Sequence, residues 1–157
     1  KAFFGENYYL LTDALMSSKE ASRIMKEEKN NQRVFKMFDH VTISVSGIGS
    51  FYPTEESVLA SPDFMSTEDL EMLKQENVSG DIALRFFDHD GQECNTTLKE
   101  RMISISMEQF KKIDRKISLV SGVSKANAVL SALKGGLVDV LILDSNLAEA
   151  LLKLTQE

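Results

Sequence analysis

The sequence predicts an α/β protein with a mostly parallel sheet and flanking helices. Over the second half of the chain, short apolar runs alternate with amphipathic helical patterns in the order β-α-β-α. This alternation is typical of parallel sheets whose faces are covered by helices. The chain has 157 residues, of which 43% are hydrophobic, so a single domain over residues 1–157 can bury a sizeable core.

The first part of the chain is expected to form two helices. Ser17 and Ser18 are good N-cap residues for a helix that runs to about Glu28. A shorter helix is expected over residues 32–38.

A strand and a long loop are expected next. In the run VTISVSGIGS, β-branched residues alternate with Thr and Ser over residues 41–46, which favours a strand. Gly47 and Gly49 end it. Residues 50–66 contain both prolines of the chain and are expected to form a loop, and loops of this length in compact domains are often functional or mobile.

The middle of the chain is expected to form a helix and two strands. Ser66 or Thr67 can cap the helix, and Asp90-Gly91 is a favourable hairpin dipeptide. In order, we expect a helix to about Glu76, a strand over 81–88, a turn at Asp90-Gly91 and a strand over 100–106.

The last third of the chain carries clear helix-capping signals. Ser106 and Gln109 have the spacing of a capping box for a short helix. Gly135 is the expected C′ residue after a helix over 124–134, and Asp144 is expected to cap the last helix. The remaining elements are a strand over 116–122 and a buried strand over 137–144.

Composition and charge exclude several classes of function. The formal net charge is −6, and contacts to nucleic-acid phosphates need clustered Lys and Arg, so we expect no direct nucleic-acid binding by this chain. Cys94 is the only cysteine, which excludes an internal disulfide and fits a cytoplasmic protein. No apolar run approaches the roughly 18 residues of a membrane span, and no signal peptide is visible. We therefore expect no membrane partner.

Ligands in open α/β sheets bind beyond the carboxyl ends of the strands, and three places in the sequence meet this condition. The first is the run SGIGS, in which Gly47, Ile48 and Gly49 follow a predicted strand. Glycines let the backbone approach a ligand closely and leave amides free to bind it. The alternative is a plain turn, which the residues alone favour.

The second place is Lys125, at the start of the helix predicted over 124–134. Ser124 is expected at the N-cap and Lys125 at the first helical position. Helix N-termini carry a partial positive charge and favour anions there. A lysine adds a second positive charge at this position, and the lysine together with the free amides of the helix start suits a site for a phosphate or another anionic group. The alternative is a solvated surface lysine, which is the usual fate of a lysine.

The third place is Asp81, which opens the strand predicted over 81–88 directly after Gly80. Side chains two residues apart share a face of a strand, so Asp81, Ala83 and Arg85 are expected to point the same way. The carboxylate could accept hydrogen bonds from sugar hydroxyls, and Ala83 would leave space for them. The alternative is an aspartate that satisfies nearby amides at a strand start.

No catalytic or metal-binding set is expected. His40 and His89 have no cysteine partners at zinc spacing, and the run DHDG lacks the spacing of a calcium loop. The sequence contains no nucleophile elbow and no P-loop. We therefore expect no metal, no cofactor and no enzymatic activity.

Several stretches together resemble the effector-binding domain of the SorC type of bacterial sugar-responsive transcriptional regulators. They are VTISVSGIGSF, VSGDIALRFFDHDGQE, ERMISIS with EQFKKI, VSGVSKANAVLSALKGGLVDVLILD and the closing LAEALL. They occur in the family's order and cover roughly residues 35–152. The second and the fourth of these runs are specific when taken together.

The resemblance implies the α/β fold shared with ribose-phosphate isomerases and glucosamine-phosphate deaminases. It also implies a domain that senses a sugar or sugar phosphate, joins to an N-terminal helix-turn-helix for operator DNA, and forms a dimer or tetramer. Asp81 and Lys125 look like the family's ligand contacts, and Gly47 to Gly49 would lie near the ligand.

The sequence departs from the family at two points. The family often has a second glycine before the lysine, where this chain has Val123, and a β-branched residue disfavours a positive φ. The family domain is also longer at its N-terminus, where it holds the DNA-binding module, a first strand and a loop that contributes to the phosphate site. The chain is therefore expected to be a partial effector domain that is truncated at its N-terminus.

Two other functions stay open on the sequence. A sugar-phosphate isomerase or deaminase could use the same fold, with Asp81 as the candidate general base. A fragment without its own ligand could serve self-association alone.

Overall fold

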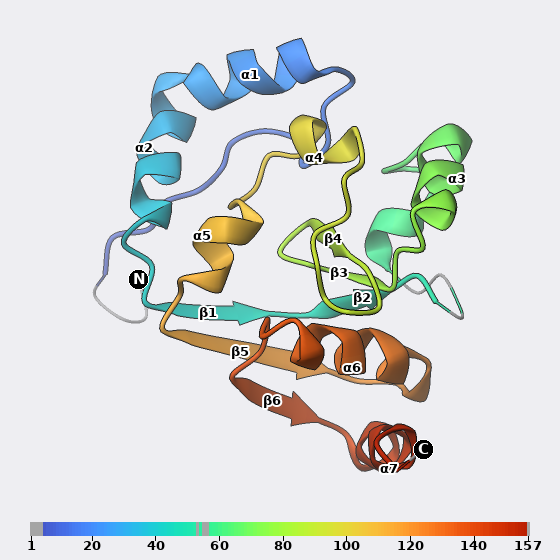
Figure 1. Ribbon diagram of the computed structural model, residues 1–157. Helices are drawn as coiled ribbons and strands as arrows, with labels where there is room; N and C mark the ends of the chain where they lie inside the picture. Colours follow the sequence, from blue (N-terminus) through green and yellow to red (C-terminus); the bar gives the residue numbers. More distant parts are fainter. Residues whose placement is uncertain (1–4, 53, 55–56, 157) are drawn as a thin grey trace.

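The computed structural model describes residues 5–52, 54 and 57–156, and in these ranges the chain forms two sheets with helices packed against them (Figure 1). The predicted loop over 50–66 includes residues 53, 55 and 56, which lie outside the described residues. The helices are α1 (Lys19–Glu27), α2 (Lys29–Phe38), α3 (Thr67–Gln75), α4 (Leu98–Arg101), α5 (Met107–Lys111), α6 (Ala126–Lys134) and α7 (Ser145–Leu154).

The first sheet is parallel, as the alternating pattern predicts. Its strands have the order β1-β5-β6, and both pairings are parallel. In Figure 1, α5 is drawn above β1 and α6 overlaps β5, and buried residues of both helices share one cluster with Val120 of β5. The predicted α/β class with a parallel sheet and flanking helices is confirmed. The strands are β1 (Ile43–Ser46), β5 (Arg115–Val120) and β6 (Val140–Leu143).

The second sheet is antiparallel, and the sequence did not predict it. Its strands have the order β2-β3-β4, and both of their pairings are antiparallel. The chain leaves β1, passes through Gly47 and enters β2 at once, so one extended segment belongs to both sheets (Figure 1). The strands are β2 (Ile48–Ser50), β3 (Gly80–Ile82) and β4 (Arg85–Phe87).

The strand predicted over 81–88 is wrong, because the chain reverses in its middle. Ala83 and Leu84 have φ angles of +50° and +64°, and Ile82 pairs directly with Arg85. Two successive left-handed residues form a tight hairpin turn that Gly or Asn normally occupies. Neither residue type is present at these positions, so the sequence carried no signal of the turn.

The strand predicted over 100–106 is also wrong. Its first residues belong to α4, Met102 forms only an isolated bridge with Leu15, and the chain bends at Ser104. The guanidinium group of Arg85 donates hydrogen bonds to the backbone oxygens of Ile105 at 2.6 Å, Ser104 at 3.1 Å and Lys99 at 3.1 Å. A buried side chain therefore satisfies carbonyl groups that a neighbouring strand would satisfy in a sheet.

Most of the predicted helix caps are confirmed. The side chains of Ser18, Ser66 and Asp144 each accept a hydrogen bond from a backbone amide in the first turn of α1, α3 and α7. The capping box of Ser106 and Gln109 opens α5. The C-terminus of α6 differs from the prediction, because Gly135 has helical angles and the left-handed residue is Gly136, with a φ of +66°.

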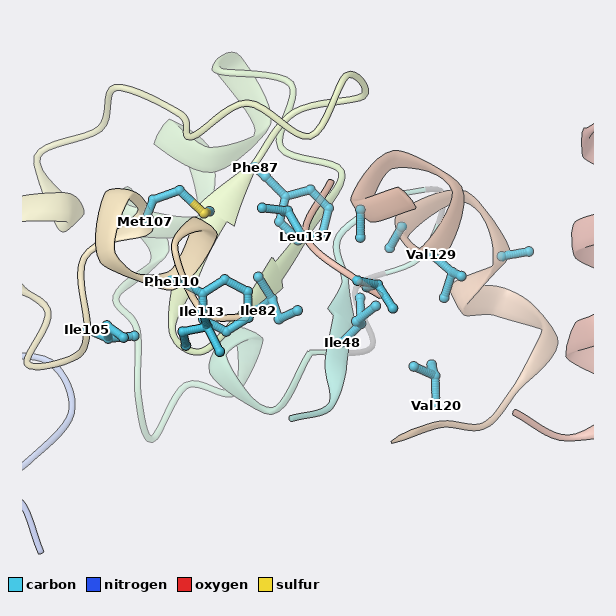
Figure 2. Close-up of a cluster of buried hydrophobic side chains, with 14 of the residues drawn as sticks. Ile48, Ile82, Phe87, Ile105, Met107, Phe110, Ile113, Val120, Val129 and Leu137 are labelled. Atoms are coloured by element: carbon cyan, nitrogen blue, oxygen red, sulfur yellow. The ribbon is translucent and has the colours of Figure 1, made fainter. Parts of the chain in front are cut away.

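The main hydrophobic cluster lies where the two sheets meet the helices (Figure 2). Ile48 of β2 and Phe87 of β4 are 2% and 0% exposed. They belong to one cluster with Phe110 of α5, Val120 of β5 and Val129 of α6. This cluster fixes the start of α6 relative to the junction of β1 and β2.

The other face of the parallel sheet is exposed, although the sequence predicts covered faces. Exposure alternates along β5, where Val120 is 5% exposed and Leu119 is 50% exposed. Val45, Ile117 and Val140 are register partners across the three strands, and so are Leu119 and Ile142. The exposed fractions on this face are 59% for Ile43, 68% for Val45, 50% for Leu119, 37% for Val140 and 52% for Ile142.

No helix among the described residues is both long enough and apolar enough to span a bilayer.

Candidate ligand site at the junction of the two sheets

A cavity of about 440 Å³ opens where β1 passes into β2. This is the carboxyl end of a parallel strand, which is the usual place for a ligand in an α/β protein. The six residues predicted to contact a ligand, Asp81, Lys125, Gly47, Ile48, Gly49 and Ala83, all line it. The other lining residues are Ala14, Ser46, Ser57, Val58, Leu59, Phe64 and Leu84.

Gly49 provides the space that the Asp81 side chain occupies. The two residues are partners in the pairing of β2 with β3. A Cβ atom at Gly49 would lie 2.0 Å from the Oδ1 atom of Asp81 and 2.6 Å from the Oγ atom of Ser57. Gly47 is less constrained, because a Cβ atom there would meet only the Leu119 carbonyl oxygen, at 3.8 Å. The run SGIGS is therefore more than a plain turn, since one of its glycines makes room for a buried carboxylate.

Asp81 is a buried acid with one fixed oxygen. The residue is 8% exposed, and its Oδ1 atom accepts a hydrogen bond of 2.5 Å from the Ser57 hydroxyl. Burial raises the pKa of Asp81 to about 6, although the Ser57 hydrogen bond and the charge of Lys125 both lower it. A carboxyl group with this pKa is mostly ionised near pH 7.5 and accepts hydrogen bonds from hydroxyl groups.

Lys125 enters the cavity from the start of α6, but its local structure differs from the prediction. A 3₁₀ turn over Val123–Lys125 precedes the helix, and Lys125 is the N-cap residue. The prediction of a Ser124 cap is wrong, because no side chain caps this helix. Among the described residues no carboxylate forms an ion pair with Lys125, although its charge acts on Asp81.

The turn before Lys125 resolves the question raised by Val123. Gly122 takes the positive φ, at +104°, and Val123 lies in the 3₁₀ turn. The Gly122 amide also donates a hydrogen bond of 2.9 Å to Asp144, whose other carboxylate oxygen accepts from the Leu147 amide at 3.0 Å. Asp144 therefore holds the turn in place in addition to capping α7.

Ala83 lines the cavity, but Arg85 does not share its face. The hairpin turn separates the two residues, so the expected alignment of Asp81, Ala83 and Arg85 is wrong. Arg85 is 6% exposed and binds backbone carbonyl groups before α5. Its role is structural.

Ser46 and Ser57 also line the cavity, and neither was among the predicted ligand contacts. Ser57 is the one that contacts Asp81. It lies in the long loop predicted over 50–66, but that loop is rich in Ser and Thr. Only the fold brings Ser57 to Asp81, which is 24 residues away in the chain. No local sequence signal separates it from its neighbours.

The other candidate groups do not form a second reactive site. Cys94 is buried, and burial raises the pKa of its thiol to about 12, so the reactive thiolate is disfavoured. No cluster of three potential metal-ligating side chains occurs among the described residues. A groove of about 560 Å³ lies between α6 and α7 and is lined in part by Asn127, Asn146 and Glu149.

Comparison with known proteins places the chain among regulators. The family described as "Putative sugar-binding domain" matches residues 1–153. The deoxyribonucleoside regulator of Bacillus subtilis is 27% identical over 143 residues, which are 91% of this chain and 45% of that protein.

Solved structures agree with this placement. A DeoR family transcriptional regulator from Listeria monocytogenes matches with a TM-score of 0.83 and 31% identity, over 91% of this chain and 57% of that one. The full-length sorbitol operon regulator SorC from Klebsiella pneumoniae matches with a TM-score of 0.80 and 25% identity, over 88% of this chain and 44% of that one.

The chain spans less than half the length of the curated relative described above. The relatives are named as regulators of transcription. The family match covers nearly the whole chain, and the fold is the one seen in the solved regulators. The chain therefore belongs to the sugar-binding domain family of SorC-type transcriptional regulators.

Proposed function

We propose that this chain is the effector-sensing part of a bacterial transcriptional regulator and that its effector is a sugar or sugar phosphate. The observation that carries the proposal is the cavity of about 440 Å³ that has a buried carboxylate and a lysine in its lining. A phosphorylated sugar carries hydroxyl groups, which complement the carboxylate, and an anionic group, which complements the lysine.

Within this proposal, Asp81 accepts hydrogen bonds from effector hydroxyl groups and Lys125 attracts the anionic group. The positive end of the α6 dipole acts in the same direction as the lysine charge. Gly47, Ile48 and Gly49 form the wall of the site, and Ala83 leaves room for the effector.

The wider role is proposed from the regulator names of the relatives together with the family resemblance. The regulator would work in the cytoplasm, contact operator DNA through a separate N-terminal domain and act as a homo-oligomer. The net charge of −6 supports a separate DNA-binding domain, because this chain has no excess of basic residues for phosphate contacts. The effector would act by binding one state of the assembly more tightly than another.

We propose binding without turnover, against the isomerase or deaminase alternative. Asp81 and Lys125 are the only titratable side chains among the described residues that line the cavity. The regulator names of the relatives also favour a sensor.

The test is calorimetric titration of the protein with a panel of ribose, deoxyribose, glucose and sorbitol, each with and without a terminal phosphate. At least one compound is expected to bind, and the phosphorylated form is expected to bind more tightly. Lys125→Ala should weaken binding by about tenfold or more, the loss expected for a charged contact. Lys134→Ala, at the exposed far end of the same helix, is the matched control and should not change the affinity.

Two outcomes contradict the proposal. Conversion of the bound compound, detected by mass spectrometry of the mixture, would support the enzyme instead. Binding that is unchanged in Lys125→Ala and in Asp81→Asn would place the ligand elsewhere.

A further inference from the structure

The two oxygens of the Asp81 carboxylate have different surroundings. Oδ1 accepts a hydrogen bond of 2.5 Å from Ser57 Oγ. Oδ2 accepts no hydrogen bond from any described residue, and Asp81 lines the cavity. One oxygen is therefore engaged inside the protein, and the other has unused acceptor capacity.

The Ser57 hydroxyl is fixed by the backbone around it. Its Oγ atom accepts a hydrogen bond of 3.1 Å from the Leu59 amide, and the Ser57 amide donates one of 3.1 Å to the Ser50 carbonyl oxygen at the end of β2. Leu59 in turn is 5% exposed and belongs to a second hydrophobic cluster, which includes Leu73 and Phe86. The Leu59 amide donates to a lone pair of Ser57 Oγ, so that bond does not use the single hydroxyl proton. Because an ionised carboxylate can only accept hydrogen bonds, the hydroxyl proton points to Asp81.

Gly49 completes this arrangement. A Cβ atom there would overlap Asp81 and Ser57 together, so the missing side chain lets the serine and the carboxylate meet against the backbone of β2. Three separate segments of the chain therefore meet at the hydrogen bond between Ser57 and Asp81.

We propose that Ser57 is a positioning residue for effector recognition, which holds Oδ1 of Asp81 so that Oδ2 faces the cavity as an acceptor for an effector hydroxyl group. This inference rests on the proposed function. It adds a specificity rule: near neutral pH the effector must bring a hydrogen-bond donor to Asp81, and a deoxy or O-methyl analogue at that position must bind more weakly.

The first test needs no ligand. The pKa of Asp81 is measured by carbon-detected NMR titration in the wild-type protein, in Ser57→Ala and in Ser61→Ala. Ser57→Ala is expected to raise the pKa of Asp81, because the serine hydrogen bond stabilises the ionised form. Ser61 is the matched control, because it lies in the same loop and its Oγ atom also accepts a hydrogen bond from a backbone amide, that of Asp63. An unchanged Asp81 pKa in Ser57→Ala would overturn the proposal.

A measurement on the unmodified protein guards against a variant that does not fold. The hydroxyl proton of Ser57 should be protected from exchange and should shift as Asp81 titrates. A hydroxyl proton in fast exchange, with no dependence on that titration, would also overturn the proposal.

The second test uses the compound from the panel that binds most tightly, together with its deoxy analogues. Ser57→Ala should weaken binding of the parent compound by about tenfold, which is the loss expected for a misplaced charged acceptor. It should weaken binding of the analogue without the recognised hydroxyl group much less. Equal losses for both compounds would contradict the positioning role. If the wild-type protein binds no member of the panel, the proposed function fails, and the ligand-free NMR test still decides the role of Ser57.

Discussion

The burial of Asp81 in the candidate site lowers the stability of the folded protein near neutral pH. Its carboxylate is 8% exposed, and the pKa of about 6 in the folded protein exceeds the ordinary value of 3.8. The folded state therefore binds a proton more readily than the unfolded state between these values. The free energy of unfolding falls as the pH rises from about 4 to about 6 and stays lower above that range.

Replacement of this acid by its amide should stabilise the protein. At pH 7.5 Asp81→Asn is expected to raise the free energy of unfolding by about 2–3 kcal/mol, because a neutral amide avoids the cost of burying a charge. The gain should disappear near pH 4, where the wild-type side chain is neutral in the folded state. Urea unfolding at both pH values measures it, and the exposed Asp63→Asn serves as the control. An equal gain at both pH values would contradict this origin.

Gly49 is the second residue at which the site restricts the sequence. Gly49→Ala is expected to lower the free energy of unfolding by about 1–3 kcal/mol, the range for an overpacked interior. Gly47→Ala, two residues away with its nearest contact at 3.8 Å, should change it by less than about 0.5 kcal/mol. Thermal unfolding of the two variants makes the comparison, and similar losses in both would argue against a specific clash with Asp81.

At the scale of elements, the hairpin of β3 and β4 is the feature that places Ala83 in the cavity lining. Ala83 and Leu84 both have positive φ angles, which cost a residue with a side chain roughly 1–2 kcal/mol. Strained backbone of this kind is common beside functional sites. Here it turns the chain after Ile82, the residue that follows Asp81.

The turn predicts a difference between two side chains of similar size. Ala83→Val should lower the free energy of unfolding by about 1–2 kcal/mol, because β-branched residues tolerate a positive φ poorly. Ala83→Asn should leave it within about 0.5 kcal/mol, since Asn adopts this conformation readily. Urea unfolding distinguishes them. Equal stability of the two variants would show that the left-handed conformation is not maintained.

Elements that depend on local signals could be predicted from the sequence, and elements that depend on distant partners could not. The serine and aspartate caps of α1, α3, α5 and α7 act within one turn, so their positions were correct. The run after α4 alternates apolar and polar residues as a strand does. Its carbonyl groups are bonded by Arg85 instead of by a strand, and the sequence gives no sign of that contact.

The same distinction applies to the candidate site. The positions of Asp81 and Lys125 in the predicted elements and the resemblance both singled them out, and both line one cavity. Ser57 was missed because its meeting with Asp81 depends on how the loop returns to the end of β2. Their roles in binding stay predictions.

At the scale of the whole molecule, the uncovered face of the parallel sheet is the least expected feature. Parallel sheets normally have both faces covered, and exposed apolar patches often mark interaction surfaces. The expected N-terminal extension and the expected homo-oligomer would each offer a cover for this face. Both stay predictions.

The exposed face should bind a hydrophobic dye. Val45→Thr combined with Ile142→Thr is expected to reduce the fluorescence of bound anilinonaphthalene sulfonate with little loss of stability, because both side chains are more than half exposed, at 68% and 52%. Val120→Thr, on the covered face of the same sheet, should cost about 1–3 kcal/mol of stability without reducing dye binding. Unchanged fluorescence in the double variant would show that this face is already covered in solution.

The central claim is that a sugar-type effector binds at the junction of the two sheets. The most direct test is the map of backbone amide shifts, measured by NMR, when the tightest-binding compound of the panel is added. We predict that the largest shifts occur at Gly47, Gly49, Asp81 and Lys125. Largest shifts in the groove between α6 and α7, at Asn127 and Asn146, with no change at Asp81, would contradict the account.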